Sequence, residues 1–194
     1  GGAGFIGGNL INHLLENTNS LIINLDKVSY ASEFNKFASI KKKLGSEFLK
    51  RYKFLKIDLK NSEDLLDILF KFKPELIFNL AAESHVDRSI MKPRDFVDNN
   101  IIGTFNLLDS VRGFLEIEKN LSHFKFIHVS TDEVFGSLRN GYFNEKSPYK
   151  PNSPYAASKA SSDHLVRSWN RTFDVPTIIT NCSNNFGPWQ FPEK

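Results

Sequence analysis

The sequence contains one cysteine, Cys182, and no long apolar run. A single cysteine cannot form an internal disulfide and offers no cluster for a metal, so we expect a reducing compartment, the cytoplasm, and no metal site. No run of about 18 apolar residues is present to span a membrane. The first residues also lack the basic and then apolar pattern of a secretory signal. The sequence therefore predicts no membrane partner.

Internal repeats and low-complexity tracts are also absent. The hydrophobic content of 40% and the 18 phenylalanines exclude a disordered chain. A net charge of +3 over 194 residues is too small to indicate a polyanionic partner. The basic residues form no stripe interleaved with aromatic residues, so we predict no nucleic-acid partner.

The sequence lacks an initiator methionine. It begins inside a glycine-rich stretch and ends at Pro192-Glu193-Lys194. We therefore interpret it as a piece of a longer protein.

Short apolar runs alternate with helical patterns along the chain, which is typical of βα units in a parallel sheet. We predict five strands, at 21–25, 52–59, 76–80, 125–130 and 176–180. Helices are predicted around Leu10–Leu15, from about Asn61 to Phe72, from about Asn99 to Glu116 and from about Pro154 to Phe173. The Lys-rich segment 32–50 is expected to be a partly helical connection with solvated lysines. The fold class is α/β, a Rossmann-type doubly wound parallel sheet, with its site at the carboxyl ends of the strands.

Gly1, Gly4 and Gly7 directly precede a predicted helix. Glycines at such positions let backbone N–H groups approach a pyrophosphate at the helix N-terminus. Asp26 follows Gly7 by 19 residues, at the end of the next strand, where a carboxylate can accept both ribose hydroxyls of an adenosine. The same carboxylate would repel a 2′-phosphate, so NAD is favoured over NADP. The alternative, that Asp26 is only a turn residue at the strand end, fits the joint spacing of the glycines and Asp26 less well.

Tyr155 and Lys159 are separated by one helical turn. A cation beside a tyrosine, together with the positive nicotinamide, favours the phenolate and so makes it a base. Thr131, at the end of the preceding strand, adds a hydroxyl. These three residues suit removal of a proton from a carbinol during hydride transfer.

With these residues the chain resembles the extended short-chain dehydrogenase/reductases that act on nucleotide sugars. The run Ser130-Thr131-Asp132-Glu133-Val134-Phe135-Gly136 is similar to the motif of the dTDP-glucose 4,6-dehydratase branch. This resemblance implies that Tyr155 deprotonates the sugar's C4 hydroxyl, Glu133 takes the C5 proton and Asp132 protonates the leaving C6 oxygen. It also implies recycled NAD, a nucleotide-diphospho-sugar such as dTDP-glucose as partner, and a homodimer. A strand before Gly1 and a substrate domain after Lys194 are expected as well.

The resemblance implies further contacts, carried over residue by residue. The cofactor-binding set comprises Gly1, Gly4, Phe5, Ile6, Gly7, Asp26, Lys27, Tyr30, Asp58, Leu59, Leu80, Ala81, Ala82, Asn100, Tyr155, Lys159 and Asn181. The substrate-binding set comprises Ser84, His85, Thr131, Asp132, Glu133, Asn184, Glu193 and Lys194. Residues 1–180 are assigned to the NAD-binding domain and residues 181–194 to the start of the nucleotide-sugar region.

Three positions depart from the family pattern. Gly8 stands where serine is frequent, and Phe135 and Phe186 stand where tyrosine is usual. The two phenylalanines keep the ring volume, so we expect their packing to survive without the hydroxyl hydrogen bonds.

Other functions stay open at this point. UDP- or CDP-glucose 4,6-dehydratases fit the same motifs, because the nucleotide base of the substrate is recognised largely outside this sequence. A 4-epimerase fits less well. A non-catalytic NAD-binding regulatory relative is the alternative from another class, although every catalytic residue is retained.

Overall fold

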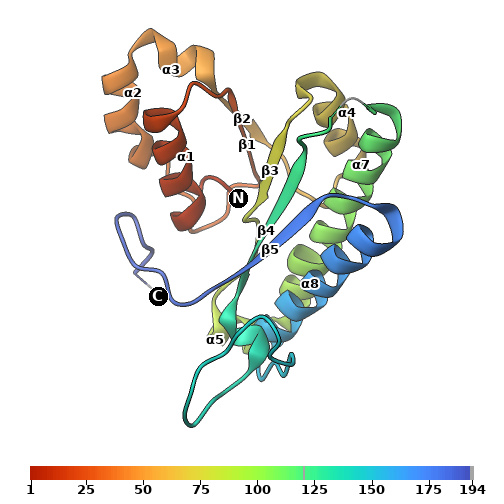
Figure 1. The fold of residues 1–194 in the computed structure, drawn as a ribbon. Helices are drawn as coiled ribbons and strands as arrows, with labels where there is room; N and C mark the ends of the chain where they lie inside the picture. Colours follow the sequence, from red (N-terminus) through yellow and green to blue (C-terminus); the bar gives the residue numbers. More distant parts are fainter. Residues whose placement is uncertain (120, 193–194) are drawn as a thin grey trace. The chain divides into compact units, whose positions relative to one another are not determined.

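The computed structural model describes residues 1–119 and 121–192 (Figure 1). They form two units, which are described separately. Unit 1 comprises residues 1–58 together with the described residues from 185 on, and unit 2 comprises residues 59–184.

Unit 1 is built on a pair of parallel strands, with Ile22 opposite Tyr52 and Asp26 opposite Lys56. Its elements are α1 (Phe5–Asn17), β1 (Ile22–Asp26), the 3₁₀ turn η1 (Asn35–Phe37), α2 (Ala38–Leu44), α3 (Ser46–Arg51) and β2 (Tyr52–Lys56). The core joins α1 to the connection between the strands through Ile11, Leu15, Phe37, Ile40 and Phe48.

The connection 32–50 is partly helical, as predicted. The lysines at 41–43 are exposed, in agreement with the solvated face that the sequence indicates. Lys36 is an exception that corrects this prediction, because its side chain is only 2% exposed. Its surroundings are described below.

Unit 2 contains a parallel sheet in the order β3-β4-β5. Its elements are α4 (Ser62–Phe72), β3 (Leu76–Asn79), α5 (Val86–Met91), α6 (Pro93–Phe96), the π-helical turn η2 (Val97–Ile102), α7 (Gly103–Ile117), β4 (Lys125–Thr131), the 3₁₀ turn η3 (Asp132–Phe135), α8 (Pro154–Phe173) and β5 (Thr177–Cys182). Asn79 pairs with His128, and Thr131 pairs with Cys182. The carboxyl ends of the three strands therefore lie at one edge of this sheet.

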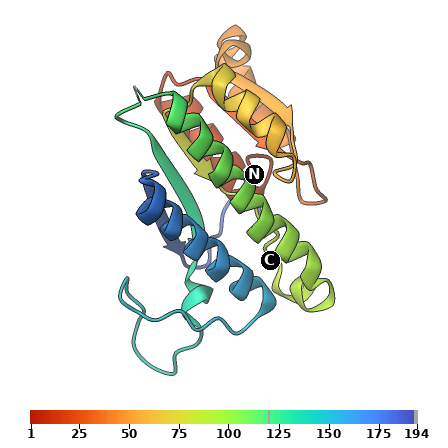
Figure 2. The same ribbon diagram turned by 90° about the vertical axis from the view of Figure 1, so that its right-hand side faces the viewer.

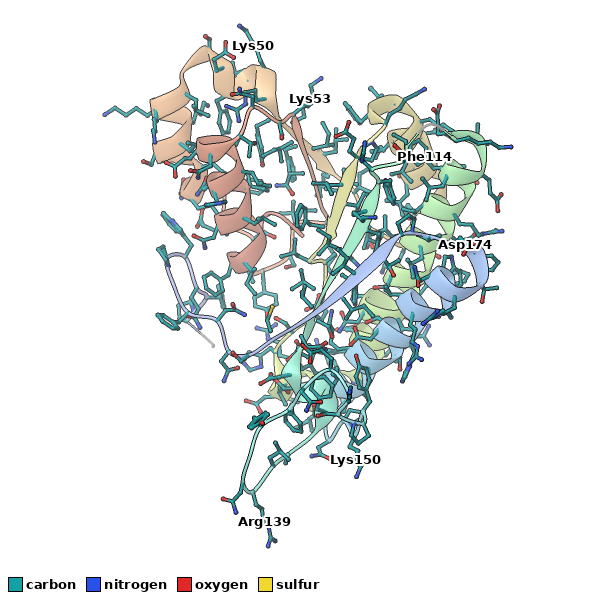
Figure 3. The ribbon with its side chains drawn as sticks, viewed as in Figure 1. Lys50, Lys53, Phe114, Arg139, Lys150 and Asp174 are labelled. Carbon is teal, nitrogen blue, oxygen red and sulfur yellow. The ribbon has the colours of Figure 1, made fainter. Side chains whose placement is uncertain are left out.

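Helices α7 and α8 lie side by side on one face of this sheet (Figure 2). Phe114 of α7, which Figure 3 labels, is fully buried, as are Leu108, Val111 and Phe126. Burying an aliphatic or aromatic side chain of this size contributes about 2 kcal/mol. Val166 of α8 is also fully buried, so the helix that carries the candidate catalytic side chains is part of this packing.

All five predicted strands are present, and the α/β class with parallel pairing is confirmed. The helix predicted from about Asn99 begins as the π-helical turn η2. Within the described residues, no helix combines the length and the apolar character needed to cross a membrane.

Candidate active site

The glycine turn, residues 1–8, leads into α1 in unit 1. A Cβ atom at Gly7 would lie 2.4 Å from the carbonyl oxygen of Gly1 and 2.8 Å from Cα of Gly2, so only glycine permits this close approach. Gly4 caps α1 with extended backbone and no side chain. The N–H groups of the first turn have no acceptor within an α-helix, which makes this end a site for a phosphate.

Asp26, at the end of β1, anchors the glycine turn. Its Oδ2 accepts a hydrogen bond from the backbone N–H of Ala3 at 3.0 Å. Its Oδ1 accepts from the N–H of Val28 at 2.8 Å and from the hydroxyl of Ser32 at 3.3 Å. Asp26 therefore organises the strand-end turn as well as the glycine turn. Ribose binding stays a prediction, and Oδ2 retains a lone pair for it.

Unit 1 also contains the predicted cofactor residues Phe5, Ile6, Lys27, Tyr30 and Asp58. Phe5 lies beside Gly187, whose Cβ would be 3.7 Å from its ring. The Tyr30 ring meets Phe191 edge to face at 5.4 Å. Two more residues of the set are half-buried, Lys27 and Asp58, and Ile6 is 40% exposed. Their cofactor contacts stay predictions.

In unit 2 the acidic pair follows directly from the end of β4. The hydroxyl of Thr131 accepts a hydrogen bond from the N–H of Glu133 at 3.2 Å and so caps the 3₁₀ turn η3. This turn places Asp132 and Glu133 immediately beyond the strand, and both are half-buried. Neither belongs to a fully solvated loop.

Helix α8 presents Tyr155 and Lys159 on its buried side, 7% and 3% exposed. The helix starts at Pro154, and Ser153 caps it by accepting the N–H of Ala156 at 3.0 Å. Tyr155 shares a side-chain hydrogen bond with Thr131. Lys159 donates to the carbonyl oxygen of Val129 in β4 at 2.8 Å. The structure thus brings together the strand-end cluster, which we define as Thr131, Asp132, Glu133, Tyr155 and Lys159.

The surroundings of Tyr155 and Lys159 shift the pKa values of both side chains. Burial, and then the charge of Glu133, raise its pKa to about 12, although the hydrogen bond with Thr131 lowers it. Burial lowers the pKa of Lys159 to about 8, against the charge of Asp163. Without the nicotinamide charge that the prediction includes, the protein surroundings favour the neutral phenol. Ionisation of the phenol therefore needs additional positive charge.

A buried polar network supports this cluster, and the sequence did not reveal it. The Asp163 carboxylate accepts hydrogen bonds from Ser130 at 2.7 Å and from the hydroxyl of Tyr149 at 3.0 Å. Nε2 of His128 lies 3.4 Å from Asp163, and Nδ1 lies 3.1 Å from the amide nitrogen of Asn79. Burial is the main cause that lowers the pKa of His128. The available signal was the spacing of Asp163, four residues after Lys159 on the same helix.

The loop from η3 to α8 is fixed at its base beside the acidic pair. The backbone N–H of Lys150 donates to the carbonyl of Val134 at 2.9 Å. At Gly136 (φ +90°) a Cβ would lie 2.3 Å from the carbonyl oxygen of Lys150. Figure 3 shows Lys150 near this base and Arg139 at the far end of the loop.

Asn100, a predicted cofactor residue, is 1% exposed and organises the loop after β3. Its Oδ1 accepts the N–H of Glu83 at 2.8 Å, and its Nδ2 donates to the carbonyl of Glu83 and to Ser158 Oγ, both at 2.9 Å. Both amide hydrogens are therefore used inside the protein. This arrangement positions the half-buried neighbours Ser84 and His85.

The remaining predicted residues have varied surroundings. Asn181 is exposed and donates to the carbonyl of Thr131 at 3.2 Å. Asn184 is also exposed. Leu59 lies shortly after β2, and its carbonyl accepts a hydrogen bond from Asn106. The run Leu80-Ala81-Ala82 directly follows β3. Glu193 and Lys194 lie outside the described residues.

The two phenylalanines that replace tyrosine differ in their environment. Phe135 is buried and packs on Phe143 and Tyr149, as expected. Phe186 is 91% exposed, so the expectation that its packing survives was wrong there.

Comparisons with known proteins agree with the sequence motifs. A family model described as GDP-mannose 4,6 dehydratase matches residues 1–194. Two curated relatives are named dTDP-glucose 4,6-dehydratase, one from Neisseria meningitidis serogroup B at 46% identity and one from Escherichia coli at 47%. The alignments cover 100% of this chain and 54% and 55% of those proteins, so the chain spans about half their length.

A solved structure shares the fold. The dTDP-glucose 4,6-dehydratase of Streptomyces venezuelae, determined with NAD bound, superposes with a TM-score of 0.88 at 38% identity. The superposition covers 100% of this chain and 57% of that one.

Proposed function

Because the chain belongs to the GDP-mannose 4,6 dehydratase family, we propose that the protein carrying it converts dTDP-glucose into dTDP-4-keto-6-deoxyglucose, with NAD as a recycled cofactor. One observation carries this proposal. The acidic pair Asp132-Glu133 extends directly from Thr131, which is hydrogen-bonded to Tyr155. The names of the curated relatives support the substrate, and the NAD in the Streptomyces structure supports the cofactor.

The residues of unit 1 fit the adenosine diphosphate half of NAD. The glycine turn brings bare backbone to the N-terminus of α1, and Asp26 stands at the end of the adjacent strand. In this proposal the turn binds the diphosphate and Asp26 binds the ribose hydroxyls. When bound, NAD accepts a hydride from C4 of the sugar and returns it to C6.

The strand-end cluster supplies the proton transfers. Tyr155, polarised by Thr131, takes the proton of the C4 hydroxyl as the ketone forms. Because burial and Glu133 raise its pKa to about 12, Lys159 and the positive nicotinamide ring are needed to favour the phenolate.

The ketone makes the C5 proton acidic. Glu133 removes that proton while Asp132 protonates the C6 hydroxyl, which leaves as water. Glu133 exchanges that proton with solvent and protonates C5 as C6 is reduced, while Tyr155 releases the C4 hydroxyl proton to solvent and Asp132 takes up another. The net change is therefore the loss of one water, and the cofactor ends in its starting state.

The domain bounds, the substrate contacts, the location and the oligomeric state belong to the same proposal. Residues 1–180 form the NAD-binding domain, and residues 181–194 begin the nucleotide-sugar region. Ser84, His85, Asn184, Glu193 and Lys194 contact the sugar nucleotide. The protein acts in the cytoplasm as a homodimer.

A panel of substrates tests this function. The full-length protein is incubated with dTDP-, UDP- and CDP-glucose, and the products are identified by mass spectrometry. We expect dTDP-glucose to lose one water at the highest kcat/KM. A preference for UDP- or CDP-glucose would correct the nucleotide, while a C4 epimer of unchanged mass would overturn the dehydratase activity.

A further inference from the structure

A buried lysine supports the glycine turn of unit 1. Lys36, in η1, is 2% exposed, and its ammonium donates hydrogen bonds to the carbonyl oxygens of Ala3 at 2.9 Å and Gly4 at 2.7 Å. Lysine is seldom fully buried without a charged partner, and both of these acceptors are neutral.

Gly8 makes room for this lysine. A Cβ at Gly8 would lie 2.2 Å from Cδ of Lys36 and 3.0 Å from its Nζ. A side chain at position 8 and Lys36 in its present place therefore exclude each other. Glycine at position 8 is therefore what allows Lys36 to occupy this place.

The two hydrogen bonds hold the backbone at the N-terminus of α1. The peptide unit is planar, so the carbonyl of Ala3 fixes the direction of the N–H of Gly4, and the carbonyl of Gly4 fixes that of Phe5. Gly4 is the N-cap and Phe5 the first residue of α1. The N–H groups of Glu33 and Gly8 donate to the same two carbonyls, so Lys36 acts together with them in fixing the direction of the N–H groups at the helix N-terminus.

An anion bound nearby would stabilise the buried positive charge of Lys36. Burial lowers its pKa, and the nearby charges of Glu33 and Asp26 oppose that effect. A cation at the positive end of a helix is unfavourable by itself, and a bound diphosphate would compensate both charges.

We propose that Lys36 is a positioning residue for the diphosphate of the dinucleotide, acting from behind the glycine turn in the space that Gly8 leaves. This inference rests on the proposed function, because it deepens the cofactor site of that function. Lys36 then increases the affinity for the diphosphate, and other residues recognise the adenosine.

Ligand affinities separate this role from a general structural one. Dissociation constants of NAD, ADP and adenosine are measured calorimetrically for the full-length protein, for Lys36→Met and for the exposed control Lys42→Met. We expect Lys36→Met to weaken NAD and ADP about tenfold and adenosine less than about twofold. The control should change none of them.

Other outcomes overturn the inference in distinguishable ways. An equal loss for all three ligands, or no loss for any, would remove Lys36 from diphosphate binding while the proposed function stands. Failure of the unsubstituted protein to bind NAD would instead contradict the cofactor site itself.

A second pair of variants tests the link to Gly8 even if Lys36→Met folds poorly. Gly8→Ser is compared with Gly8→Ser/Lys36→Ala by thermal unfolding and ADP binding. We expect Gly8→Ser to lower Tm and ADP affinity in the presence of Lys36, and to lower Tm clearly less when residue 36 is alanine. The same loss of Tm in both backgrounds would show that the two positions are independent and would overturn the proposed arrangement.

Discussion

Ser130 donates a 2.7 Å hydrogen bond to the carboxylate of Asp163, and both side chains are buried. Ser130 immediately precedes Thr131 in β4, and Asp163 lies one turn beyond Lys159 in α8. The bond therefore ties the strand that leads into the acidic pair to the helix that carries Tyr155. We expect the spacing of the proposed proton-transfer groups to depend on this junction.

Asp163→Ala should destabilise the protein by about 3 kcal/mol, because it leaves the buried hydroxyl of Ser130 and the hydroxyl of Tyr149 without their acceptor. Urea unfolding of the full-length protein measures the change. The control is Ser161→Ala, an exposed hydroxyl of the same helix, which should change the free energy of unfolding by less than about 0.5 kcal/mol. Equal stability of the two variants would contradict the role of the junction.

Glu133→Gln should abolish exchange of the C5 proton with solvent and leave NAD binding unchanged. The negative charge of Glu133 raises the pKa of Tyr155, so its removal should lower that pKa. The pH dependence of cofactor reduction in single turnovers, followed by NADH absorbance, should then shift to lower pH. Wild-type turnover in this variant would remove Glu133 from the mechanism.

Lys159 should make stability depend on pH. Its pKa is about 8 in the folded protein and 10.5 as the ordinary value, so between these pH values the unfolded chain binds more protons. Burial of the charged Lys159 side chain therefore lowers the free energy of unfolding below pH 8, and this loss disappears as the pH rises toward 10.5.

The variant Lys159→Met should lack this pH dependence of the free energy of unfolding. From pH 7.5 to pH 10 the free energy of unfolding of the wild type should rise by roughly 2 kcal/mol relative to the variant. Urea titrations of both proteins at the two pH values measure the difference, and parallel behaviour would show that Lys159 is not buried as a charged group. Activity should be lost in the variant at both pH values.

Asn100→Ala should raise the KM for the nucleotide sugar and lower kcat, because the main chain of Glu83 loses both of its bonds to the amide. Steady-state kinetics measure the effect, which we expect to reach about tenfold in kcat/KM. Asn99→Ala is the control, at a half-buried neighbouring asparagine whose amide donates to the carbonyl of Asp95 and not to Glu83. A change confined to NAD affinity would instead favour the direct cofactor contact that the sequence predicts.

Much of the fold could be predicted from the sequence, because apolar runs and helical periodicity are local signals. Strands β1 to β5 and helix α8 lie within a few residues of their predicted bounds. The strand-end cluster was also accessible, since Thr131, Asp132 and Glu133 are adjacent in sequence and Tyr155 and Lys159 share a helix face.

What could not be predicted depends on contacts between distant segments. Lys36 looked like one more surface lysine, and only the folded glycine turn, 32 and 33 residues earlier, shows its two acceptors. The rise in the pKa of Tyr155 that its protein surroundings cause could not be predicted for the same reason. The Lys159 spacing is visible in sequence, whereas burial and the proximity of Glu133 are not.

The central claim is that the protein oxidises C4 and delivers the same hydride to C6 while water is lost. The most direct measurement uses dTDP-glucose with deuterium at C4 and determines the label in the product by NMR and mass spectrometry. We predict deuterium in the C6 methyl group of a 4-keto-6-deoxy product, with hydrogen from solvent at C5. Deuterium that remains at C4, in a product that has lost no water, would contradict the account.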